Sequence, residues 1–531
     1  MTGRGRIALG WGTLTFAAAL ALSGAPGISD AEAATQSAGR RAAGSLVAVT
    51  RQPAGSAREL AALSAERGRP LLAEVFHGFA GAGGERLGLG PIRGLRLGAA
   101  LVAGLLTAAL ALGGFALGGA PVALLAPAVY WFTPRTFSLG LTATPDLLGA
   151  LLWLVAVGAF ARALSAATGL ARTRAGLWCG CLCAAAAAVR PDLASLWLVL
   201  VAHWGLGRFH LGWLARRDHH TPEPAGDWST RLRRVPTAIG SALLLVPAAA
   251  LACWPSLWSA PLHGGGTLLA TLGWRQPAAV INPALLALSA LPATTVALLA
   301  LGVGHAALRL GGALRSDDGA VARQETLWLL AGLLPLLLVA AGVAPRSPGL
   351  APLAQALPPL ALLSARALVS LAELAWPARR WAVTATLALF LLYPGLRAAA
   401  LTYPHGASAW GEPLGGAPGA AWRGWPRQDG GEGVRAILPE LARYAVPGAR
   451  VRWIGAAPFA IERYRAAGLL RDDLVDAATV AEADLVVVAR DGARAEEYDA
   501  WTAFGTSRSV SAQFIDEVAL VVVHARPGTW R

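Results

Sequence analysis

Long apolar segments recur along this sequence and constrain its fold more than any other feature. We identify eleven such segments, near 7–24, 94–112, 118–133, 145–163, 175–189, 193–207, 236–254, 283–304, 327–343, 351–371 and 381–398. Most are about 17–25 residues long, which is the length that crosses the hydrocarbon core of a bilayer as a helix. The chain of 531 residues is 55% hydrophobic and only 14% charged, so a soluble globular class and disorder are both excluded for most of it.

The distribution of arginine predicts the orientation of these segments. The 45 basic residues are all arginine; residues 1–400 hold 31 of them against 15 acidic residues, a net charge of +16, whereas the rest holds 14 against 16. Most arginines of the first part lie in alternate loops. By the positive-inside rule we expect these loops and the N-terminus on the cytoplasmic side of the cell membrane, and the 25–92 loop and the C-terminal part outside. Arg93 and Arg96, at the outer edge of the second segment, argue against this orientation.

The first apolar segment is typical of an uncleaved signal anchor. A small-residue site at Ala31–Ala33 leaves cleavage of residues 1–33 as the alternative. Residues 25–92 are polar and mixed, and we expect them to form helices lying on the membrane surface. Four cysteines are present, three of them in one apolar segment without interleaved histidines or acids, so we expect packing residues rather than disulfides or a metal site.

Beyond residue 400 the pattern changes from membrane helices to a small folded domain. Short apolar runs at 450–454, 484–489 and 518–524 predict buried strands, and helical patterns lie between them at 458–467 and 493–503. The sequence therefore predicts a mainly α, multi-pass membrane domain at 1–400, with about eleven transmembrane helices. A C-terminal α/β extracytoplasmic domain at 401–531 follows. This domain lacks a glycine-rich nucleotide fingerprint, so no nucleotide cofactor is expected.

Four outer-loop arginines are candidates for binding a lipid-linked phosphate. Arginine at membrane depth is costly unless it is paired or functional, and its guanidinium binds phosphate in a bidentate manner. The four are Arg135, Arg190, Arg275 and Arg346. The alternative is that each side chain reaches to the lipid headgroups without a further role. The basicity of the chain as a whole is weak evidence for nucleic acid binding, and none is expected.

Three carboxylates and two histidines are the other candidates for chemistry. Asp30 and Glu32 follow the first segment, where a carboxylate is suited to act as a general base or to hold a divalent cation; the alternative is a solvated loop start. Asp146 begins the fourth segment, where it is either catalytic or a charge that complements the helix dipole. His77 and His263 lie on the outer side, where a structural role is the alternative for each.

The order of these features resembles the GT-C class of membrane glycosyltransferases, which includes the dolichyl-phosphate-mannose protein mannosyltransferases. In that class a first span leads into an extracytoplasmic loop that starts with adjacent Asp-Glu; here Ser29–Glu32 (SDAE) stands in that place, with the acids one residue apart. His77 matches the histidine of the His-Pro-Pro found in this loop in many members. Residues 130–146 (YWFTPR through TPD) are similar to the loop before the fourth span, and 183–192 (CAAAAAVRPD) to the span that ends in Thr-Lys-Pro.

A bacterial branch of the class has a further pattern after its last span. In this chain, the residues similar to that pattern are 403–405 (YPH), 409–411 (AWG) and 415–420 (GGAPGA). The Tyr-Tyr-Asn core of the family pattern is mostly lost here, and 428–430 (QDG) stands where the family has Tyr-Trp-Gly. The resemblance implies a sugar donor linked to polyprenyl phosphate and an acceptor hydroxyl on a lipid, glycan or protein. It also implies a single inverting displacement, with Asp30 as the base and the four arginines offsetting charge on the departing phosphate.

Two other functional classes remain open. The altered motifs are compatible with a degenerate member that serves as a scaffold for assembling the cell envelope. A transporter is the third class, and it predicts internal repeats and ionisable groups in the middle of spans, neither of which is clear in the sequence.

Overall fold

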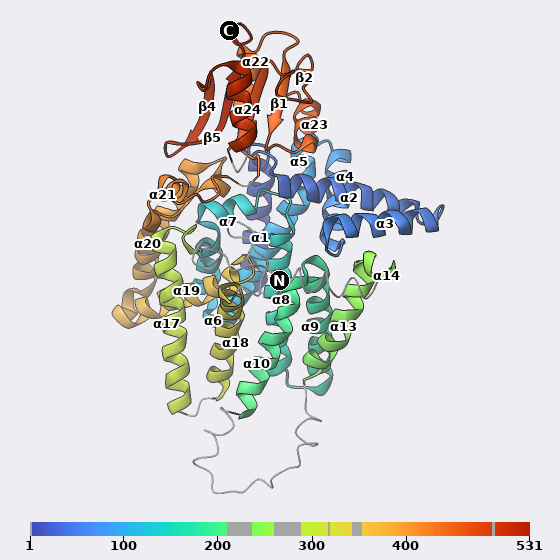
Figure 1. Ribbon diagram of the computed structural model, residues 1–531. Helices are drawn as coiled ribbons and strands as arrows, with labels where there is room; N and C mark the ends of the chain where they lie inside the picture. The colour runs from blue at the N-terminus through green and yellow to red at the C-terminus, as the bar shows by residue number, and fades with distance from the viewer. Residues whose placement is uncertain are drawn as a thin grey trace.

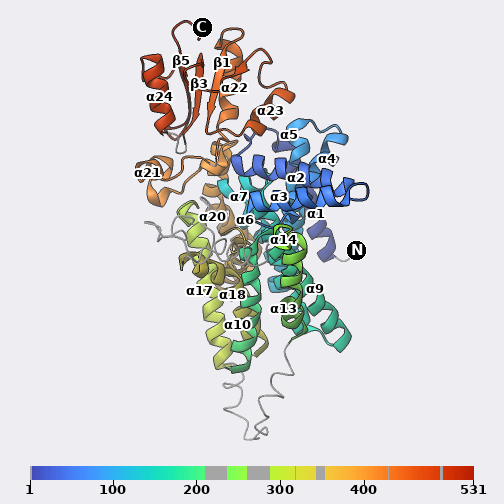
Figure 2. The same cartoon turned by 45° about the vertical axis from the view of Figure 1, so that its right-hand side comes forward.

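The protein is described by a computed structural model that covers residues 3–209, 236–259, 288–316, 319–341, 353–428, 430–490 and 494–531. Its apolar helices form an elongated bundle, short helices lie across one end of this bundle, and an α/β domain lies beyond them (Figures 1 and 2). The predicted fold class, mainly α with a small C-terminal α/β domain, is therefore confirmed.

Each of the eleven predicted apolar segments overlaps a helix of the bundle. These helices are α1 (Gly3–Leu22), α6 (Leu97–Trp131), α8 (Pro145–Ser165), α9 (Gly169–Val189), α10 (Leu196–Phe209), α13 (Thr237–Cys253), α17 (Ala293–Arg315), α18 (Gly319–Ala340), α19 (Leu357–Ala375) and α20 (Arg380–Thr402). Among the described residues, seven helices are long and apolar enough to cross a membrane: α1, α6, α8, α17, α18, α19 and α20. The chain is a multi-pass membrane protein by this measure; the count of about eleven spans and the orientation stay predictions.

The long helix α6 is a hairpin of two antiparallel helices. The break lies at Gly118 and Gly119, and Gly119 has φ +75°, a left-handed conformation that glycine adopts without a steric penalty. The indole Nε1 of Trp131 donates to Thr107 Oγ1 at 2.7 Å. In a straight helix these residues would be about 36 Å apart. The reversal explains why the sequence shows two apolar segments here, at 94–112 and 118–133.

The loop between α1 and α6 forms the helical layer that lies across the end of the bundle. It contains α2 (Asp30–Ala48), α3 (Pro53–Arg67), α4 (Leu72–Arg86) and α5 (Pro91–Leu95). These helices agree with the prediction that residues 25–92 are helical. Helices α2 and α4 cross where two glycines meet, since a Cβ on Gly78 would lie 2.9 Å from Gly39 Cα. The layer also holds α7 (Pro134–Leu139) and the short helix η1 (Pro191–Ser195), and α14 (Ser256–Ser259) packs against α3.

The C-terminal domain is built on a five-stranded sheet with the order β2-β1-β3-β5-β4. Strands β1 (Arg450–Ile454), β3 (Leu485–Ala489) and β5 (Val518–Ala525) confirm the predicted strands, and α23 (Pro458–Ala466) and α24 (Arg494–Phe504) confirm the predicted helices. β1 is parallel to β2 (Val475–Asp476) and β3, whereas β5 is antiparallel to β3 and β4 (Ser511–Ile515). The sequence did not predict β2, β4 or α22 (Val434–Tyr444). Both residues of β2 are exposed and β4 is only partly buried, so neither edge strand shows an apolar run.

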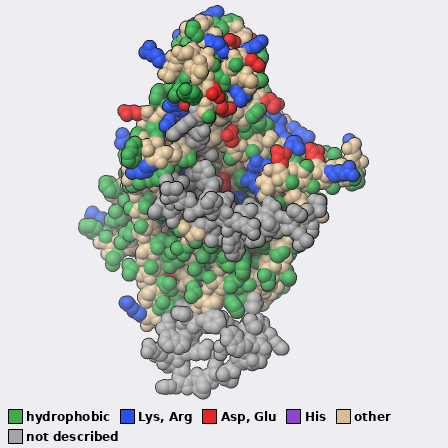
Figure 3. All heavy atoms as spheres, viewed as in Figure 1, with side chains coloured by type: hydrophobic (Ala, Val, Ile, Leu, Met, Phe, Trp, Pro, Cys, Tyr) green, Lys and Arg blue, Asp and Glu red, His purple; other side chains and the backbone are tan. Residues whose placement is uncertain are grey.

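The segment that joins α20 to this sheet is irregular. It contains η4 (Gly406–Ser408), η5 (Glu412–Leu414) and α21 (Gly416–Trp422), while η3 (Pro377–Arg379) precedes α20. Hydrophobic side chains dominate the visible surface of the bundle, and charged side chains gather over the α/β domain and the arm formed by α2 and α3 (Figure 3). Leu389 and Phe390 of α20 are 69% and 76% exposed, as expected for side chains that face lipid.

Candidate functional site

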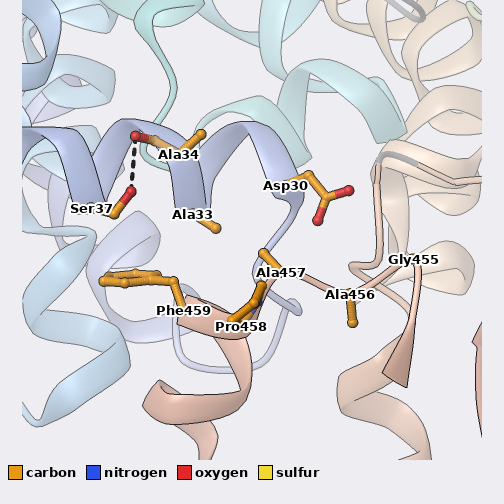
Figure 4. Close-up of a pocket in the computed structure, with 9 residues that line it drawn as sticks. All are labelled: Asp30, Ala33, Ala34, Ser37, Gly455, Ala456, Ala457, Pro458 and Phe459. Atoms are coloured by element: carbon orange, nitrogen blue, oxygen red, sulfur yellow. Dashed lines mark hydrogen bonds between the residues drawn. The ribbon is translucent and has the colours of Figure 1, made fainter. Parts of the chain in front are cut away.

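A cavity of about 430 Å³ lies between α2 and the loop that connects β1 to α23. It is lined by Asp30, Ala33, Ala34, Ser37 and residues 455–459 (Figure 4). One wall is therefore the first turns of α2 and the other belongs to the α/β domain. Ser37 Oγ donates to Ala34 O within the helix, so Asp30 supplies the carboxylate of the cavity.

Asp30 is held at the start of α2 by contacts with the C-terminal domain. Ser29 caps the helix by accepting a hydrogen bond from Glu32 N, and Asp30 N donates to Gly430 O at 2.7 Å. Gly430 has φ +44°, and a Cβ there would lie 2.9 Å from Asp30 Cβ, so this close approach requires glycine. Burial raises the pKa of Asp30, while a hydrogen bond accepted from the Ala457 N–H opposes the rise. A carboxylate with a raised pKa beside a cavity is suited to accept a proton.

Glu32 points away from that cavity, into the protein. Residues two apart on a helix are separated by about 200° around its axis, so the two carboxylates lie on opposite faces of α2. Glu32 is fully buried and forms a bidentate pair with Arg96, at 2.7 Å to Nε and 2.5 Å to Nη2. Its Oε1 also accepts from Ala143 N at 2.9 Å. Glu32 thus links α2, the start of α6 and the segment before α8.

Arg96 uses all five of its N–H groups. Besides the two bonds to Glu32, it donates to the carbonyl oxygens of Ser23, Pro26 and Gly27 at 2.6, 2.9 and 2.7 Å. The guanidinium therefore fixes the connection between α1 and α2, and with it the position of Asp30. Arg96 was not among the predicted site residues, although an ionisable residue at the end of a membrane span is a signal visible in the sequence.

Two of the predicted residues, Asp146 and Arg190, form an ion pair. Arg190, at the end of α9, pairs with Asp146 in the first turn of α8 and makes a two-point contact with Asp192, at 3.1 and 2.7 Å. Two carboxylates therefore offset the charge of Arg190. A phosphate bound by this guanidinium would have to displace one of them or approach as an additional ligand.

Arg135 belongs to α7 and contacts the segment after α20. Its Nε donates to Ala409 O at 2.6 Å, and its guanidinium carbon lies 4.3 Å from the ring centre of Trp410. In the same segment Ser408 Oγ donates to Glu432 Oε1 at 2.7 Å. The part of the sequence that carries the post-span resemblance therefore packs directly on α7. Glu432, a buried acid in this contact, was not among the predicted residues.

His77 is buried beneath the surface layer. Its Nε2 lies 3.2 Å from Thr144 O, and its Nδ1 has no hydrogen-bond partner. Burial lowers the pKa of His77 to about 4, so the imidazole is neutral at physiological pH. Because Nε2 faces a carbonyl oxygen, it carries the proton.

We expect the stability of the surface layer to fall as pH decreases from about 6.5 to 4. The unfolded chain takes up the His77 proton near its ordinary pKa of about 6.5, whereas the folded protein resists it until about pH 4, so this contribution is complete above pH 6.5. The loss amounts to about 3 kcal/mol across this window. Hydrogen exchange in α4 between pH 4 and 7 measures it. His77→Gln, which can still donate to Thr144 O, should have a shallower pH dependence; an unchanged slope would rule out His77 as the group responsible.

The predicted residues that the structure describes thus divide among three places: the cavity at Asp30, the 143–146 segment with Arg190, and the contact of Arg135 with Ala409 and Trp410. Glu32 contacts Ala143, His77 contacts Thr144 and Asp146 follows two residues later, so the 143–146 segment joins the acidic residues to Arg190. Asp30 alone of the predicted residues lines the cavity described above. Arg275, Arg346 and His263 lie outside the described residues.

A divalent cation at Asp30 would need further ligands. In the described part of the chain no three histidine, cysteine, aspartate or glutamate side chains group together in a manner suited to hold a metal ion. Mg²⁺ commonly binds through one or two carboxylates and substrate phosphates, and Asp30 offers one carboxylate. These residues alone do not form a metal site, so the mechanism proposed below has no step through a metal.

A second buried ionic cluster lies near the opposite end of the bundle. Glu325 of α18 is fully buried and accepts from Arg309 of α17 at 2.9 Å and from Arg366 of α19 at 2.6 Å. None of these three residues was predicted from the sequence. Their mutual pairing ties three bundle helices together, and we assign them no part in the site.

Comparisons with known proteins give only distant similarity. No family model matches the chain, and no curated protein sequence matches it. Among solved structures, ArnT from Cupriavidus metallidurans bound to undecaprenyl phosphate is similar over 97% of this chain and 98% of its own, with 15% identity and a TM-score of 0.48. The apo form of ArnT has 14% identity, the same coverage and a TM-score of 0.47. The Archaeoglobus fulgidus oligosaccharyltransferase in the apo form has 11% identity and a TM-score of 0.44, over 73% of this chain and 55% of its own.

Proposed function

We propose that this chain is a membrane glycosyltransferase of the GT-C type, which transfers a sugar from a polyprenyl-phosphate donor to an acceptor hydroxyl outside the cell membrane. The observation that carries the proposal is the place of Asp30. Its carboxylate, with a raised pKa, lines a 430 Å³ cavity between the surface helices and the α/β domain, beyond one end of an apolar bundle. A lipid-linked donor can reach this level from the bilayer, and a polar acceptor can reach it from the aqueous side.

The reaction proposed is a single displacement at the anomeric carbon. The acceptor oxygen forms a bond to this carbon while the bond from the carbon to the phosphate oxygen breaks, and the lipid phosphate leaves with the electron pair. Asp30 accepts the proton of the attacking hydroxyl. Arg190 and Arg135 are the described arginines proposed to offset charge on the leaving phosphate, an effect that is usually the largest in such reactions.

The test is a transfer assay on the purified full chain in lipid vesicles. The donors are labelled sugars linked to undecaprenyl phosphate, the lipid present in the ArnT structure above, and the matched nucleotide sugars serve as controls. We expect label to move from at least one lipid donor to a lipid, glycan or protein of the cell envelope, and none to move from nucleotide sugars. Transfer from nucleotide sugars alone would contradict the proposal. Absence of transfer together with absence of donor-dependent hydrogen-exchange protection in the outer loop would favour the scaffold.

Arg190 provides a test of the phosphate contact. Arg190→Lys keeps the charge between Asp146 and Asp192 but removes the planar two-point geometry. Because Arg190 is proposed to offset charge that develops on the leaving phosphate, we expect kcat to fall by about tenfold, with a smaller change in the KM for the lipid donor. The matched control is Arg174→Lys, an exposed position near the other end of α9. An equal effect of the two substitutions would show that Arg190 does not contact the donor.

A further inference from the structure

Two arginines beside the layer of surface helices have no carboxylate partner within the described residues. Arg93 lies in α5 and Arg435 in the first turn of α22. Other arginines of this layer do have partners; for example, Arg69 pairs with Glu74 and Arg96 with Glu32. The Nη1 atom of Arg435 is buried and has no hydrogen-bond partner. A buried, charged donor without an acceptor is unfavourable, so an anion at this position would stabilise the protein.

Contacts place Arg93 where three apolar helices end, and Arg435 interacts electrostatically with Arg93 and with Tyr403 at the same place. Gly24 follows the end of α1 by two residues, and a Cβ there would lie 2.8 Å from Arg93 Nε. Tyr403 follows the last residue of α20, and its hydroxyl donates to Leu22 O at 2.9 Å. Arg93 itself precedes α6 by four residues. The ends of α1, α6 and α20 thus meet at this place.

The charges at this place act on one another. Burial and the positive charges of Arg96 and Arg93 lower the pKa of Arg435, and the same cations oppose the burial that raises the pKa of Tyr403. Because all five donors of Arg96 are used within the protein, Arg96 contributes no free donor to a ligand. Of the described arginines at this place, Arg93 and Arg435 therefore have donors left for an anion.

We propose that Arg93 and Arg435, beside Tyr403, bind the phosphate group of a membrane lipid at headgroup level. Guanidinium groups match phosphate oxygens in geometry and charge, and the ends of membrane-spanning helices lie at the depth of lipid phosphates. Leu22 and Leu401, next to the site along α1 and α20, are 36% and 72% exposed and are suited to contact acyl chains. A free phosphate ion would make no use of these side chains. The site involves neither Asp30 nor Arg190 and does not depend on the proposed function.

The experiment measures lipid binding to the delipidated full chain by native mass spectrometry. The probes are phosphatidylglycerol, phosphatidylcholine and inorganic phosphate. We expect phosphatidylglycerol to bind the wild-type protein on the order of tenfold more tightly than Arg93→Gln/Arg435→Gln. The control is Arg58→Gln/Arg508→Gln, which makes the same change of charge at two exposed positions and should bind as the wild type does.

Further measurements distinguish a lipid phosphate from a free phosphate ion and show whether loss of binding results from misfolding. Arg93→Lys/Arg435→Lys retains both positive charges and should bind phosphatidylglycerol more tightly than Arg93→Gln/Arg435→Gln. Such partial recovery shows that the glutamine variant lost a phosphate contact and not its fold. Phosphatidylglycerol should also raise the melting temperature of the wild type more than that of Arg93→Gln/Arg435→Gln. Equal binding by these two proteins, or equal loss in the control, would overturn the proposal. Displacement of the lipid by micromolar inorganic phosphate would overturn the assignment to lipid and favour a free ion.

Discussion

Asp30→Asn is expected to lower the kcat for sugar transfer by about 100- to 10,000-fold, the usual contribution of a general base. The substitution keeps the size of the side chain and the backbone hydrogen bond from residue 30 to Gly430 O. The amide cannot accept the proton of an attacking hydroxyl. The KM for the lipid donor should change little, because in the proposed reaction Asp30 contacts the acceptor hydroxyl and not the lipid phosphate. Initial rates with a saturating labelled donor measure the effect.

The pH dependence gives an independent check on the same residue. A base must be deprotonated to act, so activity should rise with pH through the pKa of Asp30, and burial places this pKa above the ordinary value of 3.8. Glu66→Gln removes an exposed carboxylate from α3 and should leave both the rate and its pH dependence unchanged. If Asp30→Asn retains the wild-type kcat while the wild type transfers sugar, another group is the base and the site must be reassigned.

The sequence was sufficient to predict the helical bundle and the centre of the C-terminal sheet. Apolar length specifies a helix in a membrane because every backbone N–H and C=O must be bonded within the segment. The hairpin in α6 was also predictable, since the glycines at 118 and 119 interrupt an otherwise continuous apolar stretch. Strands β1, β3 and β5 were found because their runs of valine and isoleucine are buried, whereas β2 and β4 are short edge strands with little pattern.

The candidate site was predictable in its residues but not in its geometry. Asp30 and Glu32 were grouped because they are close in sequence, yet helical periodicity directs them to opposite faces of α2. What each carboxylate meets depends on segments far along the chain: Gly430 and Ala457 for Asp30, and Arg96 and Ala143 for Glu32. Such long-range contacts have no local signature. One sequence alone therefore does not separate an acid suited to catalysis from one that organises the loop.

The pair of Glu32 and Arg96 leads to the second large effect, which is on stability. Arg96→Met leaves Glu32 as a buried charge without a cation and removes the donors to three carbonyl oxygens between α1 and α2. Breaking a buried ion pair by removing one partner costs about 3–5 kcal/mol. Amide hydrogen exchange over residues 23–32 should therefore accelerate by at least 100-fold, and the melting temperature of the chain should fall.

Glu32→Gln provides the comparison that separates organisation from catalysis. The amide is nearly isosteric and can still accept from Ala143 N and from Arg96, so the loss of stability should be smaller than for Arg96→Met. If Glu32 serves only to position Asp30, the rate should decrease in parallel with the loss of protection at 23–32, and the pH dependence set by Asp30 should be retained. A Glu32→Gln protein that keeps its protection but loses the pH dependence of its rate would instead identify Glu32 as the titrating base. The two carboxylates at the start of α2 would then have exchanged roles, because the buried one, and not the one beside the cavity, would accept the proton.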